Sequence, residues 1–202
     1  MFASRTEAGQ KLAQRLTKFS HIENGIVLAL PRGGVIVGKE IAEKLNLPLD
    51  IIVTRKIGAP QNSEYAVAAV SEHELIISPR ENPRKNYLEL EAQKERREIQ
   101  RRVSLYRKGK SKLNLKDKIV FLVDDGLATG LTMEAAIREV QFYRPRKVIL
   151  AVPVAPPETI AHLKTLVGEC IVLNIEPMFF AVGQFYENFP QISDKEVLNL
   201  LK

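Results

Sequence analysis

Two adjacent carboxylates and the short loop after them are the residues of this sequence best suited to binding chemistry. Asp124 and Asp125 come directly after the apolar run Ile119–Val123 and precede a segment of small and hydroxylated residues, 126–132. Carboxylates accept hydrogen bonds from hydroxyl groups and can hold Mg²⁺. A small-residue loop that opens a helix offers backbone N–H groups and a favourable dipole to a phosphate. The combination predicts a pocket for a ribose 5-phosphate.

The apolar spacing on either side of the loop predicts the elements that position it. The run 119–123 is typical of a strand buried on both faces. An amphipathic helix is expected from Met133, with Thr132 as its N-cap. The hydroxyls of Thr129 and Thr132 are candidate donors to the phosphate. The alternative is a strand that happens to end in two acids and is followed by an ordinary capped helix.

This stretch resembles the phosphoribosyl-pyrophosphate signature of type I phosphoribosyltransferases, an apolar strand and two acids followed by Gly-x-Ala-Thr-Gly-x-Thr. The resemblance implies that Asp124 and Asp125 are catalytic acids that hold the ribose hydroxyls. It also implies Mg²⁺ as cofactor, carried by phosphoribosyl pyrophosphate, with the same two acids as candidate ligands. The residues implied for the 5′-phosphate are Gly126, Ala128, Thr129, Gly130, Leu131 and Thr132.

A second loop, 31–34, also follows an apolar strand and opens a helix. Its glycines allow close approach to an anion, and Arg32 can pair with phosphate oxygens. An Arg-Gly-Gly sequence is common in the pyrophosphate loop of the same family, so the resemblance implies that Arg32, Gly33 and Gly34 bind pyrophosphate. The alternative is a turn with a surface arginine. The segment 33–40 also fits most of the nucleotide-binding Gly-x4-Gly-Lys motif, but Glu40 stands where Ser or Thr should ligate Mg²⁺, so we reject that motif.

A pair of cations, Arg55 and Lys56, follows the apolar strand 49–53 and is expected near the same edge of the sheet. Lys56 is our candidate for a contact to pyrophosphate or to the base side of the site; the resemblance implies a cationic residue near here without identifying which. A solvated pair of charges is an equally good explanation.

The segment 84–118 is strongly basic, with 13 Lys or Arg against 5 Asp or Glu. Its spacing predicts a long charged helix from Tyr87 to about Lys108, where this family usually carries a mobile loop over the active site. Arg80, Arg84 or Lys85 are candidates to close over pyrophosphate. For most of the helix we favour a solvated surface with i,i+4 ion pairs.

Aromatic residues gather near the C-terminus, where 177–190 holds five of the thirteen. Related enzymes cover the base with a small hood, and Phe185 or Tyr186 could stack on an acceptor ring there. The favoured alternative is that these rings pack against the edge of the sheet and cover it. The histidines at 21, 73 and 162 lack ligand spacing and receive no role.

Strands and helices alternate along the chain, and most strands are apolar throughout. This pattern predicts an α/β fold with a doubly wound, mainly parallel five-stranded sheet and helices on both faces. The resemblance implies the type I phosphoribosyltransferase fold with a small C-terminal or flap hood. We expect a single domain over 1–202, with a core of about 25–173, a charged helical insertion of about 80–112 and a hood of about 175–192.

Composition narrows the class of protein. The net charge is +6, the single cysteine Cys170 excludes a disulfide framework, and no apolar run approaches eighteen residues. The N-terminus lacks the apolar core of a signal peptide. We therefore expect a cytoplasmic protein without a membrane partner.

The resulting functional prediction is an Mg²⁺-dependent phosphoribosyltransferase of nucleotide metabolism that releases pyrophosphate. Its partners would be phosphoribosyl pyrophosphate and a small-molecule acceptor with a nucleobase-like nitrogen, in a homodimer as is common in the family. One alternative is a non-catalytic regulator of the same fold that senses phosphoribosyl pyrophosphate or a nucleotide and contacts nucleic acid through 84–118. Another is a hydrolase or phosphorylase with the same pocket. The sequence does not identify the acceptor.

Overall fold

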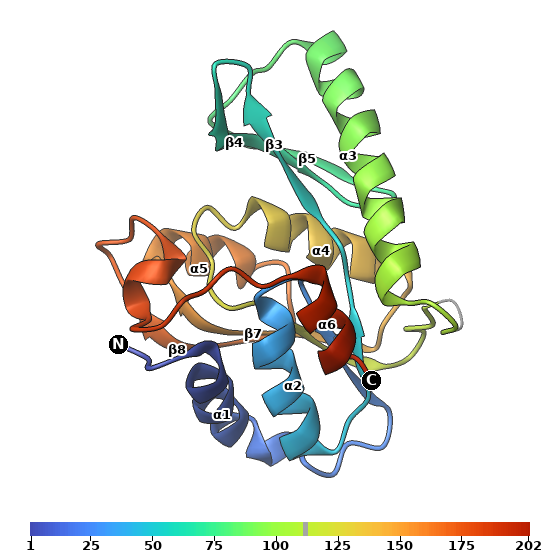
Figure 1. Cartoon of the computed structure of the whole chain (residues 1–202), viewed down its shortest axis with the longest axis vertical. Helices are drawn as coiled ribbons and strands as arrows, with labels where there is room; N and C mark the ends of the chain where they lie inside the picture. Colours follow the sequence, from blue (N-terminus) through green and yellow to red (C-terminus); the bar gives the residue numbers. More distant parts are fainter. Residues whose placement is uncertain (111–112) are drawn as a thin grey trace.

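A five-stranded parallel sheet forms the centre of the computed structural model, which describes residues 1–110 and 113–202 (Figure 1). The order is β2-β1-β6-β7-β8, and each neighbouring pair is parallel. The strands are β1 (Gly25–Ala29), β2 (Leu49–Ile51), β6 (Ile119–Val123), β7 (Lys147–Ala155) and β8 (Glu169–Ile175). Strand order reverses between β1 and β6, and ligands of such sheets bind beyond the carboxyl ends of the strands at this reversal.

Helices cover both faces of this sheet because alternate strand residues point to opposite sides. Val27, Phe121 and Ile149 pack in one cluster with α1 (Arg5–Arg15) and α2 (Gly34–Leu45). Leu28, Leu122 and Leu150 pack in another with α4 (Leu131–Phe142) and α5 (Pro157–Leu163). Each fully buried side chain of this size contributes about 1.5–3 kcal/mol. The expected doubly wound, five-stranded parallel fold is confirmed.

A second, three-stranded antiparallel sheet projects above the main sheet in Figure 1. It consists of β3 (Arg55–Ala59), β4 (Asn62–Val70) and β5 (Leu75–Ile77), and the long helix α3 (Lys85–Tyr106) packs against it. We call these four elements the insertion. Strand β3 was not expected, because Ile57 is its one buried residue and the sequence around it reads as a polar loop.

Several boundaries differ from those that the spacing of apolar and turn residues predicts. A helix is predicted over 6–19, but α1 ends at Arg15 and is followed by the 3₁₀ turn η1 (Thr17–Phe19). A helix is predicted over 156–167, but α5 ends at Leu163. An exposed loop is predicted over 61–63, but Asn62 and Ser63 begin β4. A second predicted loop, 109–114, includes residues 111–112, which lie outside the described residues.

The C-terminal segment returns to the N-terminus. After β8 the chain forms the 3₁₀ turn η2 (Val182–Phe185) and the final helix α6 (Asp194–Leu200). Phe2 N–H donates to Phe185 O at 2.8 Å, and Glu187 N–H donates to Phe2 O at 2.8 Å. We call 175–192 the hood. No helix within the described ranges 1–110 and 113–202 has the length and apolarity needed to cross a membrane.

Candidate active site

The two loops singled out in the sequence lie side by side at the reversal of strand order. Ala29 pairs with Val123 at the carboxyl ends of β1 and β6, and Leu30 N–H donates to Val123 O at 2.9 Å. Asp124 and Asp125 follow β6 directly, and α2 begins at Gly34. The register of two parallel strands thus brings the acids next to the Arg-Gly-Gly loop, although 90 residues separate them.

Gly33 and Gly34 are packed directly onto the acids. A Cβ atom on Gly33 would lie 1.9 Å from Asp125 Oδ2, and one on Gly34 would lie 2.8 Å from Asp124 Oδ1. The peptide bond between Pro31 and Arg32 is cis. The sequence suggested that these glycines admit an anion; the structure adds that any side chain here would displace the carboxylates.

Asp125 is held by residues that the sequence analysis did not connect with it. The Nε–H of Arg5 donates to Asp125 Oδ2 at 2.6 Å, and both side chains are largely buried, at 8% and 13% exposed. Tyr186 donates its hydroxyl proton to the backbone carbonyl of Asp125 at 2.5 Å. The first turn of α1 and the hood therefore both hold this acid.

Arg5 was missed because its partner lies 120 residues away along the chain. One signal was available. An arginine that begins a helix opposes the helix dipole, and the residue four positions on, Gly9, cannot pair with it. The acid in that turn, Glu7, pairs instead with Lys11 at 2.8 Å.

Asp124 lies deeper than a typical carboxylate. Its Oδ1 accepts a hydrogen bond from the backbone N–H of Asp125 at 2.8 Å. Burial, and then the neighbouring Asp125 carboxylate, raise the pKa of Asp124 well above its usual value, whereas the charge of Arg5 acts in the opposite direction. Burial likewise raises the pKa of Tyr186, so its hydroxyl is a donor at neutral pH.

The loop predicted to bind the 5′-phosphate is held to β7 and α5 by hydrogen bonds, and two of its residues are exposed to solvent. Leu127 N–H donates to Val154 O at 3.0 Å, and Thr159 Oγ1 donates to Ala128 O at 2.7 Å. Ala128 and Thr129 are exposed, and α4 starts two residues later. An anion can therefore reach the helix N-terminus at this point.

The N-cap of α4 differs from the expectation. Gly130, with φ of 78°, occupies that position, and Leu131 already belongs to the helix. Thr132 is therefore a half-buried first-turn residue and does not cap the helix. The left-handed backbone angle explains the glycine, and a Cβ there would also lie 2.7 Å from Thr159 Cγ2.

The cations proposed for pyrophosphate lie on different elements. Arg32 Nη1 is 3.9 Å from Asp194 Oδ1 at the start of α6, in a half-exposed position. Arg55 is engaged by Glu95 of α3 at 2.7 Å, and Lys56 faces Ala69 across β3 and β4. Lys56 thus belongs to the insertion, and its part in a pyrophosphate site stays a prediction.

Asp194 joins the Arg32 loop to α3. The Tyr106 hydroxyl donates to Asp194 Oδ1 at 2.5 Å, and Arg101 Nη2 is 3.5 Å from Oδ2. The hydrogen bond from Tyr106, followed by the charge of Arg101, lowers the pKa of Asp194. Burial and this contact raise the pKa of Tyr106 to about 12.

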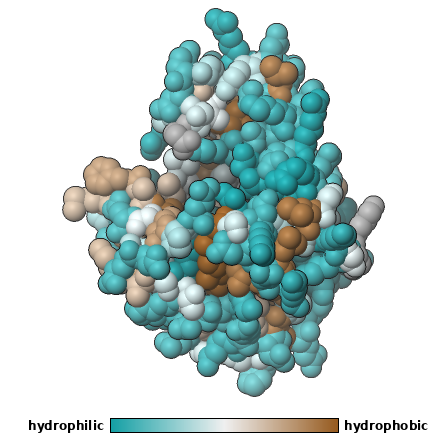
Figure 2. All heavy atoms as spheres, viewed as in Figure 1, coloured by the Kyte–Doolittle hydropathy of each residue, from teal (hydrophilic) through white to brown (hydrophobic). Residues whose placement is uncertain are grey.

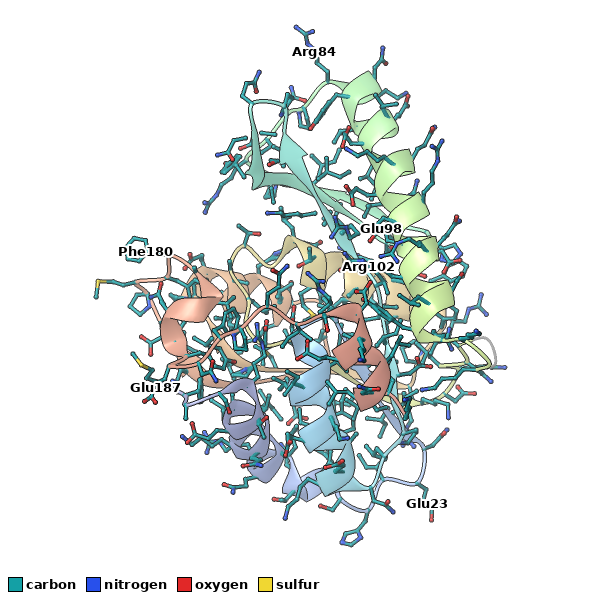
Figure 3. The ribbon with its side chains drawn as sticks, in the orientation of Figure 1. Glu23, Arg84, Glu98, Arg102, Phe180 and Glu187 are labelled. Carbon is teal, nitrogen blue, oxygen red and sulfur yellow. The ribbon has the colours of Figure 1, made fainter. Side chains whose placement is uncertain are left out.

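The hood places its rings unequally. Tyr186 is 5% exposed and packs against Phe2 and Phe189, with ring centroids 5.4 and 5.0 Å away. Phe185 packs on Phe179, while Phe180 is 89% exposed and projects from the hood (Figure 3). Figure 2 shows this tip as an apolar protrusion. A stacking role for Phe185 or Tyr186 stays a prediction, and the buried ring of Tyr186 favours an anchoring role.

Several ion pairs form along the surface of the basic helix α3. Glu98 accepts from Arg101 and Arg102 at 2.7 Å each, and those hydrogen bonds lower the pKa of Glu98 to about 2 (Figure 3). Lys94 pairs with Glu91 at 3.2 Å. Arg84, at the start of the helix, points away from the body at the far end of the insertion in Figure 3. These pairs favour the interpretation of α3 as a solvated surface.

Two surface hollows lie away from these loops. One is beside α3 and α4, lined by Ile99, Glu139 and Tyr143 among others, and the second is at the amino edge of the sheet near Leu49 and Lys118. Neither is lined by the acids or by the Arg-Gly-Gly loop. The candidate site is therefore defined by the meeting of two loops and a helix N-terminus.

The chain is similar to known proteins along its whole length. The model of the phosphoribosyl transferase domain family matches residues 4–189. A Mycobacterium tuberculosis H37Rv protein, provisionally named a phosphoribosyl transferase, is 39% identical over 206 residues; the match covers 100% of this chain and 46% of that protein. A strain CDC 1551 protein with the same kind of name matches equally. This chain thus spans about half the length of these curated relatives.

Solved structures agree on the architecture. The crystal structure of TT1426 from Thermus thermophilus is 41% identical, with a TM-score of 0.83 and coverage of 100% of this chain and 97% of that one. A purine phosphoribosyltransferase from Pyrococcus horikoshii is 18% identical, with a TM-score of 0.52 and coverage of 94% and 93%. At that identity the second likeness is one of fold.

Proposed function

Since this chain belongs to the phosphoribosyl transferase domain family and has the type I phosphoribosyltransferase fold, we propose that it transfers a ribosyl 5-phosphate group. The donor is phosphoribosyl pyrophosphate, the acceptor is a small molecule with a nucleobase-like nitrogen, and pyrophosphate leaves. The observation that carries the proposal is the direct packing of Gly33 and Gly34 against Asp125 and Asp124. It joins a diol-binding pair of acids to an anion-binding loop.

Each part of the site has a role in this reaction. Asp124 and Asp125 accept hydrogen bonds from the ribose hydroxyls and place negative charge near the sugar as positive charge develops on it. Residues 126 and 128–132 bind the 5′-phosphate, with the exposed Thr129 and the start of α4 as its contact points. Arg32, Gly33, Gly34 and Lys56 bind pyrophosphate.

The chemistry is a displacement at the anomeric carbon. The bond from that carbon to the pyrophosphate oxygen breaks, a bond to the acceptor nitrogen forms, and the pair of electrons leaves with pyrophosphate. The proton that the acceptor nitrogen loses passes to solvent water. The protein forms no covalent bond in this step, so orientation supplies much of the acceleration, about 7–11 kcal/mol in favourable cases. Because Arg5 already donates to Asp125 Oδ2, that oxygen is a poor place for a proton from the acceptor.

Magnesium fits the donor set of the site. Mg²⁺ usually takes one or two carboxylates together with phosphate oxygens, and Asp124 and Asp125 offer carboxylate oxygens beside the loop proposed for pyrophosphate. When bound with the substrate, the ion would offset the charge of the leaving pyrophosphate.

The test is a pyrophosphate-release assay with phosphoribosyl pyrophosphate, Mg²⁺ and a panel of purine and pyrimidine bases. We expect release with at least one base, and loss of that release in Asp124→Asn/Asp125→Asn with the fold retained by circular dichroism. Full activity of the double variant would contradict the roles given to the acids.

The same preparation tests a non-catalytic regulator. Binding of phosphoribosyl pyrophosphate without release of pyrophosphate for any base, together with salt-sensitive binding of nucleic acid, would favour the regulator. The ion pairs that occupy α3 weigh against that outcome. We also expect the protein to be cytoplasmic and to form a homodimer. Size-exclusion chromatography with light scattering would measure its oligomeric state.

A further inference from the structure

We infer that Arg5 is a positioning residue of the candidate site, one that fixes the Asp125 carboxylate for the sugar and supplies the positive charge beside the two acids. This inference rests on the proposed function. It concerns a residue at the start of the chain, outside both loops that the sequence singled out.

Arg5 touches three separate parts of the molecule that meet at the site. Its Nε–H donates to Asp125 Oδ2 at 2.6 Å, and its Nη1 donates to Pro190 O in the hood at 2.9 Å. The guanidinium carbon lies 3.6 Å from the centroid of the Phe189 ring. A Cβ on Gly33 would lie 2.8 Å from Arg5 Nε, so the pyrophosphate loop is also in contact range.

These contacts leave the guanidinium little freedom. Arg5 is 7% exposed, and its guanidinium group lies over the ring of Phe189. Its Nε and Nη1 donate to oxygens on two different segments, those of Asp125 and Pro190. A buried charge in so many fixed contacts costs stability unless it is compensated, and Asp125 is the compensating charge.

The pairing fixes the orientation of the Asp125 carboxylate. Its Oδ2 is engaged by Arg5 and lies against the Gly33 position, so the group cannot turn without losing these contacts. A carboxylate that rotates freely would present either oxygen. Fixing the group therefore sets the direction from which the sugar hydroxyl is received, and misplacement of such a group by about 1 Å can cost about a hundredfold in rate.

The charge of Arg5 also matters for the acids as a pair. The ionisable groups whose charges act on one another here are Asp124 and Asp125 after β6, Arg5 on α1 and Tyr186 in the hood. Two adjacent carboxylates disfavour each other's ionised form, and Arg5 is the cation that opposes this.

The experiment compares Arg5→Gln, which removes the charge at similar size, with Arg5→Lys, which keeps the charge and loses the stacked fork. Lys11→Gln is the matched control, because Lys11 is an exposed cation on the same helix and pairs only with Glu7 among the salt bridges of the described residues. Affinity for phosphoribosyl pyrophosphate with Mg²⁺ is measured by calorimetry at pH 7.

We expect Arg5→Gln to weaken binding by about ten- to a hundredfold at pH 7, as for a lost charged hydrogen bond. Arg5→Lys should restore part of the affinity, because it keeps the charge beside Asp125 and loses the contacts of the planar guanidinium. Lys11→Gln should behave as the wild type. A residue that merely braces the fold would change the free energy of unfolding without changing the affinity of the folded protein.

A second arm needs no ligand. The free energy of unfolding is measured by urea denaturation at pH 7 for the wild type, Arg5→Gln, Asp125→Asn and the variant with both substitutions. The loss in the double variant should be smaller than the sum of the two single losses, because both substitutions remove the same 2.6 Å ion pair.

Two results would overturn the inference: an affinity unchanged in Arg5→Gln, or losses in the free energy of unfolding that simply add in the double variant. Failure of the wild type to bind phosphoribosyl pyrophosphate is a different outcome, because it refutes the proposed function while the unfolding measurements still judge the pairing of Arg5 with Asp125.

Discussion

The hydroxyl of Tyr186 donates a 2.5 Å hydrogen bond to the backbone carbonyl of Asp125, so the hood holds the main chain of the acid that Arg5 holds by its side chain. Tyr186 is in turn packed between Phe2 and Phe189. The N-terminus, the hood and the end of β6 therefore behave as one structural unit around Asp125.

Removing that hydroxyl should be costly although the ring remains. Tyr186→Phe leaves a partly buried carbonyl without its donor, and we expect a loss of about 1–3 kcal/mol in the free energy of unfolding. Tyr65→Phe is the control, because the Tyr65 hydroxyl bonds to Glu81 at the surface and its residue is 50% exposed. Urea denaturation measures both; equal effects in the two variants would contradict the role of the buried bond.

Gly33→Ala should abolish function through steric contact. The added carbon would lie 1.9 Å from Asp125 Oδ2, so the carboxylate or the loop must move, and we expect pyrophosphate release to fall by about a hundredfold or more. Gly168→Ala is the control, because its Cβ would approach the flexible side chain of Lys147 at 2.9 Å, away from the site. Activity of Gly33→Ala within a few fold of the wild type would show that the two loops are looser than the structure indicates.

The ionised Asp124 carboxylate should lower the free energy of unfolding, and this effect should be present at high pH and absent at low pH. Its raised pKa means that the folded state binds a proton more tightly than the unfolded chain does, so the free energy of unfolding falls as pH rises between the unfolded and the folded pKa. Asp124→Asn removes this penalty and should be more stable than the wild type at pH 8, by about 1.4 kcal/mol for each unit of the pKa difference.

That gain should shrink as pH falls through the folded pKa and reach a constant value below about pH 3.5, where Asp124 is protonated in both states. Denaturation at pH 3.5, 5, 6.5 and 8 measures it. A gain that is independent of pH would mean that the substitution acts through packing and not through charge.

The insertion is fastened to α4 by a buried acid. Glu139, 2% exposed at its side chain, accepts from Ser71 Oγ at 2.7 Å and lies 2.7 Å from His73 Nδ1. We expect His73→Ala to cost about 1–3 kcal/mol, because a buried carboxylate loses a partner. His162→Ala should cost less, because the side chains of His162 and its partner Glu134 are 56% and 12% exposed, so water can replace the lost contact. A larger loss in His162→Ala would contradict this comparison.

The features that could be predicted from sequence depend on residues that are adjacent in the chain. The apolar run that forms β6 was predicted with its observed limits, because burial on both faces requires an unbroken apolar segment. The position of the two loops at one edge followed from parallel strands. By contrast, β3 was missed, because an edge strand with one buried residue has little apolar signal.

Long-range contacts account for what could not be predicted. The partner of Arg5 is 120 residues away, and the partner of Tyr186 is 61 residues away. The cap of α4 was assigned to Thr132 because hydroxyl residues are good N-caps, but the left-handed angle at Gly130 starts the helix earlier. Such contacts and backbone angles depend on the assembled fold.

The final prediction separates the two phosphate sites of the proposed ligand. Arg32 belongs to the loop proposed for pyrophosphate, whereas Thr129 is exposed at the start of α4, where the 5′-phosphate is expected. Ribose 5-phosphate carries the 5′-phosphate and lacks the pyrophosphate. Arg32→Ala should therefore weaken binding of phosphoribosyl pyrophosphate by about tenfold or more and leave binding of ribose 5-phosphate unchanged.

Thr129→Ala should instead weaken both ligands by a similar factor, about two- to tenfold for one neutral hydrogen bond. Calorimetric titration of each variant with each ligand, Mg²⁺ present, gives the four values needed. Arg32 is 3.9 Å from Asp194, so Asp194→Asn serves as the check that loss of this ion pair alone does not mimic Arg32→Ala. If Arg32→Ala weakens ribose 5-phosphate as strongly as phosphoribosyl pyrophosphate, the assignment of the two loops to two different phosphates is wrong.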